Sequence, residues 1–251
     1  MMSRTEERLR VVSTDAAPRT RVIPLKERTL RKHRIVAPFL GQYEADVFRT
    51  LRTLVSTRMT ERGARTLGIC SAREGEGKSM VALNLAISSA FDVNHTILLV
   101  ELDFRWPRLH QNLGIRVTKG LADVLSGNAT IAECLINPGY ERLSVLPARA
   151  TLARSSETLA SPAMAEIAKE LRERYPDRII IYDLPPVLLS DDCLAFMQHL
   201  DAFLFVVGEG RTAKQEVDRA LSLTDPAKLI GTVLNGARNN VDKPKYYYAN
   251  Q

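Results

Sequence analysis

The sequence predicts an α/β fold: a doubly wound, mostly parallel sheet with helices on both faces. Short apolar runs alternate with segments in which apolar residues recur three and four positions apart, as in strands alternating with amphipathic helices. Several runs, such as 97–100 and 203–207, are continuously apolar, which is typical of strands covered on both faces. Strands joined by helical crossovers run parallel, with right-handed connections.

The expected elements follow one another in regular order along the chain. We expect strands at 66–70, 96–102, 143–146, 178–182, 202–207 and 229–234. We expect helices at 46–59, 79–91, 121–125, 162–174, 192–199 and 214–223. Gly63 follows the first of these helices and is a stop signal.

Charge divides the chain of 251 residues unevenly. Ten of its 35 Lys and Arg but only four of its 29 Asp and Glu lie in 1–37, so that segment carries the whole net charge of +6. We expect a flexible basic arm over 1–40, a folded domain over 41–240 and a tail over 241–251. The folded part shows no basic patch interleaved with aromatics, so no nucleic-acid partner is expected. No apolar run approaches about 18 residues, so no membrane-spanning helix is expected.

The strongest motif is Ala72-Arg-Glu-Gly-Glu-Gly-Lys-Ser79, which follows the first expected strand and opens a helix. In this phosphate loop (P-loop), glycines let backbone N–H groups surround phosphate oxygens, while the lysine reaches the β- and γ-phosphates and the serine hydroxyl can hold Mg²⁺. A glycine-rich turn before a helix is the plainer interpretation. The expected ATP-binding residues here are Gly75, Glu76, Gly77, Lys78, Ser79 and Met80. The side chains of Glu74 and Glu76 are expected to point outward, because a carboxylate facing phosphate is repelled.

Carboxylates follow two other apolar runs. Glu101 and Asp103, two positions apart at the end of 96–102, are expected to project to one face, and Asp183 ends the strand at 178–182. Ligands of such sheets bind at the carboxyl ends of the strands. We therefore expect a Mg-ATP site in which Ser79, Asp103 and Asp183 hold the metal. Arg105 is expected either to pair with Asp103 or to face phosphate, and the sequence does not decide between the two.

Together these motifs resemble the bacterial tyrosine kinases of capsule and exopolysaccharide loci, relatives of the MinD/ParA deviant-Walker ATPases. The likeness extends over residues 40–251. The helix with Asp46, Arg49 and Arg52 resembles the acid-x-x-Arg-x-x-Arg helix with which this family self-associates in rings. Asn235 resembles the residue that approaches the adenine. Near the end of the likeness, the three adjacent residues Tyr246, Tyr247 and Tyr248 resemble the C-terminal cluster on which these kinases autophosphorylate.

The resemblance implies an ATP-dependent tyrosine autokinase that regulates polysaccharide synthesis and export. Its catalytic residues would be Lys78, Glu101 and Asp103, with one of the two acids accepting the tyrosine proton. Its cofactors would be ATP and Mg²⁺, and its partner a membrane-spanning activator of the chain-length-regulator type. The protein would be cytoplasmic and recruited to the inner face of the membrane. The basic arm would touch anionic lipid or that partner.

The sequence departs from the family where Glu101 replaces the usual Asp, which lengthens the side chain by one methylene. Two alternatives therefore stay open. One is a ParA/MinD-like ATPase, whose signature lysine early in the phosphate loop would correspond to Arg73. The other is a catalytically weak nucleotide-binding regulator of a polysaccharide export complex.

Overall fold

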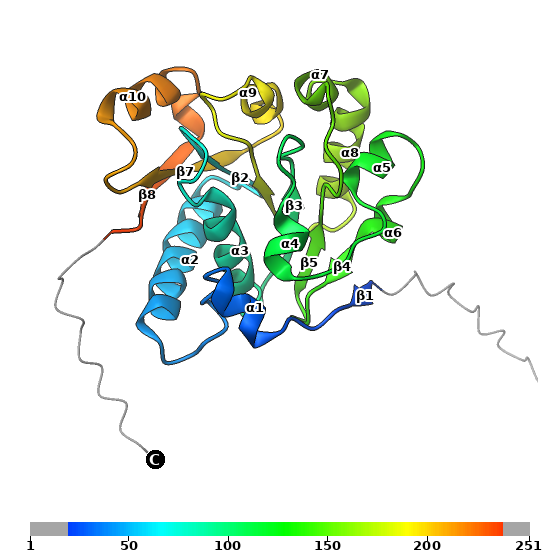
Figure 1. Cartoon of the computed structure of the whole chain (residues 1–251), viewed down its shortest axis with the longest axis horizontal. Coiled ribbons are helices and arrows are strands. Elements are labelled where there is room, and N and C mark those ends of the chain that lie inside the picture. The colour runs from blue at the N-terminus through cyan, green and yellow to red at the C-terminus, as the bar shows by residue number, and fades with distance from the viewer. Residues whose placement is uncertain (1–19, 238–251) are drawn as a thin grey trace, which may run out of the picture.

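The computed structural model describes residues 20–237, so the tyrosine cluster at 246–248 and residues 1–19 lie outside the described part. The strands are β1 (Arg21–Val22), β2 (Thr66–Ser71), β3 (Thr96–Glu101), β4 (Ile136–Asn137), β5 (Leu143–Leu146), β6 (Arg178–Asp183), β7 (Ala202–Gly208) and β8 (Leu229–Asn235). The helices are α1 (Glu27–Lys32), α2 (Tyr43–Glu61), α3 (Lys78–Ser89), α4 (Leu109–Leu113), α5 (Leu121–Leu125), α6 (Ile131–Cys134), α7 (Ser155–Leu159), α8 (Pro162–Glu173), α9 (Asp192–Met197) and α10 (Lys214–Ser222), with a 3₁₀ turn at Pro226–Lys228 (Figure 1).

The strands form one eight-stranded sheet in the order β1-β4-β5-β3-β6-β2-β7-β8. Every pairing is parallel except that of β4 with β5. All the strands expected from the sequence are present, with ends that differ by at most one residue. The expected fold class, a doubly wound and mostly parallel sheet, is confirmed.

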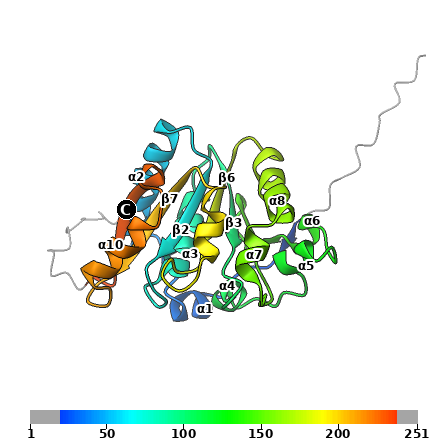
Figure 2. The ribbon, with the colours of Figure 1, turned by 90° about the horizontal axis from the view of Figure 1, so that it is seen from above.

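Helices cover both faces of the sheet, and each face has its own apolar core (Figures 1 and 2). Buried residues of α1 to α4 pack with one set of strand residues, such as Leu67 and Ile69 of β2. Buried residues of α5 to α10 pack with the alternate set, such as Cys70 of β2 and Tyr182 of β6. Burial on both faces explains why the central strands are continuously apolar.

The three central strands bring the chemical motifs together. β6 lies between β3 and β2, and the register pairs Glu101 directly with Asp183. Because parallel strands end at the same edge, the phosphate loop after β2, the acids after β3 and Asp183 share that edge.

The expectation of a flexible arm over 1–40 is wrong for residues 20–40. There β1 pairs with β4, α1 forms, and Ile35 is fully buried in the core that also contains α2 and α3. A few buried apolar residues fix this segment to the core. They are too few to change its highly basic composition, which is why composition alone predicted a flexible arm. The elements that the sequence did not predict, β1, β4, α1, α4, α6 and α7, are all six residues or shorter.

Within residues 20–237, no helix combines the length and the apolar character needed to cross a lipid bilayer.

Candidate functional site

The phosphate loop is a tight turn between β2 and α3. Gly75 and Gly77 have φ values of +82° and +92°, in the left-handed region that side chains disfavour. A Cβ atom at Gly77 would also overlap the side-chain amide of Asn235. That amide donates a hydrogen bond of 2.8 Å to the carbonyl oxygen of Glu76. Asn235, expected to approach an adenine, is therefore a brace that holds the loop from β8.

Two open cavities flank this loop. The first, here called the phosphate cavity, has a volume of about 250 Å³ and contains Lys78, Ser79 and Asp103 in its walls. The second, here called the adjacent cavity, has about 420 Å³ and lies between the loop, Asn235 and the segment after α1. Gly75, Gly77, Met80 and His33 line both cavities, so a single extended ligand can occupy them together.

Lys78 and Asp103 form the central ion pair of the phosphate cavity. The Nζ atom lies 2.8 Å from Oδ2, and the two side chains are only 11% and 8% exposed. Burial alone would lower the pKa of Lys78, but Asp183 and Asp103 outweigh it and raise the pKa. The lysine therefore stays charged, and Asp103 holds it in place, with its other oxygen accepting from the Trp106 N–H at 3.1 Å.

Asp183 is the second acid beside Lys78. It is 1% exposed, and its Oδ1 atom has no hydrogen-bond partner. Burial raises the pKa of Asp183, opposed by Lys78 and by a hydrogen bond with Ser79. A buried carboxylate oxygen without a hydrogen-bond partner destabilises the folded state unless a cation or a water molecule binds to it.

These residues fit Mg²⁺ only together with a nucleotide. Among residues 20–237, no group of three or more His, Cys, Asp and Glu could hold a metal ion by itself. Mg²⁺ is commonly bound by one or two protein oxygens together with substrate phosphates. Ser79, with Asp183 hydrogen-bonded to it and Asp103 nearby, meets that requirement.

Glu101 occupies a different position from the one expected. Oε1 accepts from the N–H groups of Arg108 at 2.6 Å and Leu109 at 2.7 Å, and Oε2 accepts from that of Ala148 at 2.9 Å. Burial raises the pKa of Glu101 to about 7, although these hydrogen bonds oppose the shift. Its carboxylate joins the start of α4 to the loop after β5. It does not line the phosphate cavity beside Asp103, so the expectation that the two carboxylates project to one face is wrong.

The other charged residues of the motifs pair with protein groups: Glu76 and Arg105 outside the phosphate cavity, and Glu74 at its rim. The Glu76 side chain turns away from the phosphate cavity, as expected, but it is buried rather than exposed. It accepts a hydrogen bond from the Arg73 N–H at 2.7 Å and another from the Thr212 hydroxyl. Glu74 is exposed at the rim. Arg105 pairs with Asp192 of α9 at 3.1 Å, which is neither of the two expected positions.

Arg73, the position that corresponds to the ATPase signature lysine, forms an ion pair with Glu216 of α10. Its side chain is 63% exposed.

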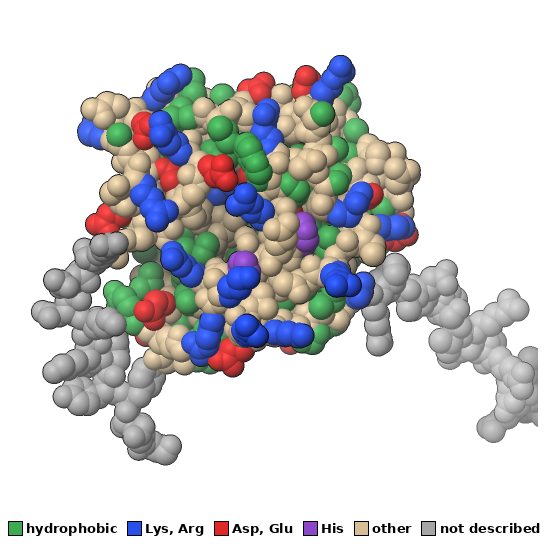
Figure 3. Space-filling view, in the orientation of Figure 1, with side chains coloured by type: hydrophobic (Ala, Val, Ile, Leu, Met, Phe, Trp, Pro, Cys, Tyr) green, Lys and Arg blue, Asp and Glu red, His purple; other side chains and the backbone are tan. Residues whose placement is uncertain are grey.

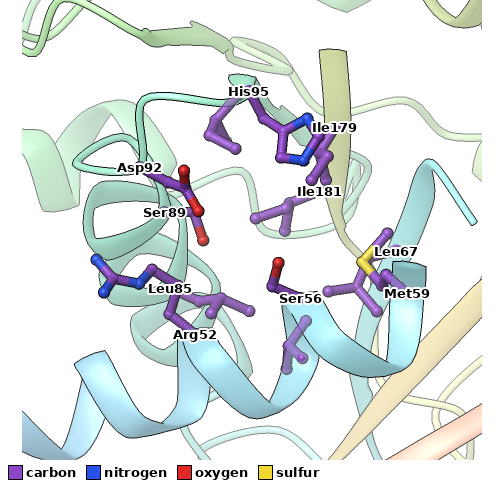
Figure 4. Close-up of a pocket in the computed structure, with 12 residues that line it drawn as sticks. Arg52, Ser56, Met59, Leu67, Leu85, Ser89, Asp92, His95, Ile179 and Ile181 are labelled. Carbon is purple, nitrogen blue, oxygen red and sulfur yellow. The ribbon is translucent and has the colours of Figure 1, made fainter. Parts of the chain in front are cut away.

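Asp46, Arg49 and Arg52 lie on α2, and none of them lines the phosphate cavity or the adjacent cavity. Asp46 and Arg49 form an ion pair with each other, while Arg52 donates to the Ser88 carbonyl of α3 at 3.0 Å. Arg52 also borders a narrow apolar cavity of about 20 Å³ between α2, α3 and the sheet (Figure 4). That cavity holds little more than one water molecule.

The site contains residues that the sequence motifs did not single out. The phosphate cavity is also lined by Arg108, just before α4, and by Asn112 of α4. At the end of α1, Lys32 and Arg34 line the adjacent cavity, and His33 lines both cavities. For Arg108 and Asn112, the sequence offered one clue, which is that they follow Asp103 within ten residues. Lys32, His33 and Arg34 were not predicted because they lie in the segment 1–40, for which the composition predicted a flexible arm.

No family model matches the chain. Curated relatives do. It is 29% identical over 206 residues to the tyrosine-protein kinase YwqD of Bacillus subtilis, covering 81% of this chain and 86% of that protein. It is 27% identical to the putative tyrosine-protein kinase CapB of Staphylococcus aureus, covering 81% and 89%. The succinoglycan biosynthesis transport protein ExoP of Rhizobium meliloti is 32% identical over 82% of this chain, but the match spans only 26% of ExoP.

Solved structures agree in fold. The chimerical protein CapA2B2 superposes with a TM-score of 0.73 at 28% identity, covering 87% of this chain and 93% of that one. The MinD protein of Pyrococcus horikoshii, complexed with Mg-ADP, gives a TM-score of 0.53 at 23% identity, covering 70% and 72%, and shows a shared fold. With its phosphate loop and its acids at the ends of β3 and β6, the chain is similar over most of its length to bacterial tyrosine-protein kinases, and it shares the fold of MinD.

Proposed function

We propose that the protein is an ATP-dependent tyrosine autokinase that regulates exopolysaccharide or capsule synthesis and export. The observation that carries the proposal is the buried group of Lys78, Asp103 and Asp183 beside an open phosphate loop. Relatives that match most of the chain are named tyrosine-protein kinases. The same group, without those relatives, would fit any enzyme that binds a nucleoside triphosphate.

The residues of the site have distinct tasks in this reaction. The loop amides and Lys78 hold the β- and γ-phosphates of ATP and neutralise their charge. Asp103 is the acid of the β3 pair that lines the cavity, so it is the residue we assign to accept the phenolic proton. The phenolic oxygen then bonds to the γ-phosphorus, and the bond from that phosphorus to the β–γ bridging oxygen breaks, releasing ADP. Mg²⁺ held at Ser79 and Asp183 would supply further charge neutralisation.

The acceptors in this proposal are Tyr246, Tyr247 and Tyr248. They follow β8, whose last residue, Asn235, braces the phosphate loop. We propose that the tail of one subunit enters the site of a neighbour in a ring-like homo-oligomer. The α2 helix with Asp46, Arg49 and Arg52 would contribute the contact between neighbours.

A membrane-spanning activator completes the proposal. ExoP, a transport protein, contains a region similar to this chain within a protein about four times as long as the match. We propose that a membrane-spanning activator of the chain-length-regulator type acts on this kinase domain. That activator would recruit the cytoplasmic kinase to the inner face of the membrane.

Incubation of the full chain with Mg-ATP, with and without the cytoplasmic segment of its activator, tests the proposal. Phosphotyrosine should appear at 246–248 by mass spectrometry and should disappear in Lys78→Met and in the triple Tyr→Phe variant. Lys169→Met, at an exposed helix position, is the matched control and should keep the signal. Phosphotyrosine that forms equally in Lys78→Met would contradict the proposal.

The same experiment separates the alternatives. Release of inorganic phosphate without phosphotyrosine would indicate a ParA/MinD-like ATPase. Nucleotide binding without either product would indicate a non-catalytic regulator.

A further inference from the structure

The turn that follows α1 lies against the nucleotide site. His33 lines the phosphate cavity together with Lys78 and Ser79. Lys32, His33 and Arg34 all line the adjacent cavity, opposite Asn235. These three consecutive residues are here called the basic turn. The face of the molecule on which α1 lies carries many Lys and Arg side chains (Figures 1 and 3).

One buried side chain fixes the basic turn to the helix that the phosphate loop opens. Asn84 of α3 is fully buried, and its Oδ1 atom accepts from the N–H groups of Val36 at 2.7 Å and Ala37 at 2.9 Å. Its Nδ2 atom donates to the carbonyl oxygens of Arg34 at 3.0 Å and Met80 at 2.9 Å. The basic turn therefore has a fixed position relative to the phosphate loop.

The backbone at Arg34 is strained. Its φ of +56° is in the left-handed region, where glycine or asparagine is the usual residue after a helix. The reversal buries Ile35 completely and leaves the Arg34 side chain exposed beside the adjacent cavity. An arginine kept where glycine would relieve strain points to a use for its side chain.

The charges of the basic turn are available to a ligand. Within the described residues, neither Lys32 nor Arg34 has an ion-pair partner, whereas Lys78 is paired with Asp103 and Arg108 with Glu74. The buried carboxylate of Glu76, at the adjacent cavity, is already satisfied by hydrogen bonds. Arg211 also lines the adjacent cavity without an ion-pair partner among the described residues, but it donates to the Gly75 carbonyl at 3.2 Å. A polyphosphate bound at the loop would therefore find two further unpaired cations in the basic turn.

We propose that Lys32 and Arg34, with His33 between them, contact the phosphate groups of a nucleoside triphosphate bound at the phosphate loop of the same chain. This inference rests on the proposed function, because it requires ATP to occupy the loop. It makes the segment before α2 a wall of the nucleotide site.

Titration of the full chain with a fluorescent N-methylanthraniloyl ATP in the presence of Mg²⁺ tests this inference. The double variant Lys32→Ala/Arg34→Ala should raise Kd about tenfold at low salt, and the difference should shrink towards 0.5 M NaCl as the charges are screened. Arg34→Gly should also raise Kd while leaving the thermal midpoint unchanged or higher, since glycine tolerates this φ. Arg28→Ala is the matched control, because Arg28 is an exposed residue of the same helix that lines neither cavity, and its Kd should equal that of the wild type.

Each outcome decides. Tight binding by the wild type with the same Kd in the double variant would overturn the inference and leave the proposed function intact. An equal rise in Kd for Arg28→Ala would also overturn it, since net charge alone would then explain the effect. Failure of the wild type to bind the analogue would remove the proposed function and this inference together.

Discussion

Replacing Glu101 by aspartate tests whether this residue holds the backbone. Its carboxylate accepts three N–H groups, two at the start of α4 and one from Ala148 in the loop after β5, at 2.6 to 2.9 Å. Glu101→Asp shortens the side chain by one C–C bond, about 1.5 Å. The shorter carboxylate cannot keep both loops at hydrogen-bond distance, so at least one buried N–H loses its partner.

The expected loss follows from that count. A buried donor without a partner costs about 1–3 kcal/mol, so we expect Glu101→Asp to lower the free energy of unfolding by about 2 kcal/mol. For a domain of this size, each kcal/mol shifts the thermal midpoint by about 2–4 °C, which gives a decrease of about 4–8 °C. The measurement is best made at pH 8, above the pKa of about 7 that burial gives Glu101, so that the wild-type side chain accepts as a carboxylate.

Differential scanning calorimetry with Glu141→Asp as control gives the comparison. Glu141 lies in an exposed turn, and shortening it should leave the midpoint within about 1 °C. Phosphotyrosine formation by Glu101→Asp at 15 °C, where both proteins are folded, should fall less than tenfold. An unchanged midpoint combined with a hundredfold loss of phosphotyrosine would refute this reasoning and would support the original expectation that Glu101 acts on the substrate.

Three further predictions concern other parts of the molecule. Gly77→Ala, which forces a side chain into φ +92° and against the amide of Asn235, should weaken nucleotide binding at least tenfold by equilibrium titration; an unaltered Kd would contradict the loop geometry. Asn84→Ala leaves one buried and one partly buried N–H group without an acceptor and should cost about 3 kcal/mol in urea unfolding, with faster tryptic cleavage in the segment it anchors; unchanged cleavage would argue against that anchoring. Burial alone would raise the pKa of Asp201, but hydrogen bonds from the Arg65 N–H, Arg172 and the Thr66 N–H outweigh it and lower the pKa. Its contribution is thus present at neutral pH and is lost below about pH 4, so Asp201→Asn should cost about 1–2 kcal/mol at pH 7 and progressively less in acid; a cost independent of pH would exclude this origin.

The sequence predicted the central sheet well because the same pattern, a continuous apolar run, occurs in each of its strands. Each central strand is buried on both faces, so its apolar run is unbroken and its ends are marked by polar residues. The prediction for the basic segment 21–37 was wrong because that segment carries no such repeated pattern. Its fold depends on a few buried side chains, such as Leu30 and Ile35, and on acceptance of its N–H groups by Asn84, some 50 residues later. A local pattern of apolar and polar residues cannot predict a hydrogen-bond partner so distant in the chain.

The acids after β3 show where a local rule stops. Residues two apart share a face only while the chain is a strand, and β3 ends at Glu101. Beyond it the backbone turns: Leu102 donates to the Asp183 carbonyl at 2.9 Å, and Asp103 accepts from the Trp106 N–H. Asp103 therefore reaches Lys78, while Glu101 turns to the loops beside the sheet. The extra methylene of Glu101 fits this division, because it lets one carboxylate span two loops while Asp103 alone faces the phosphate loop.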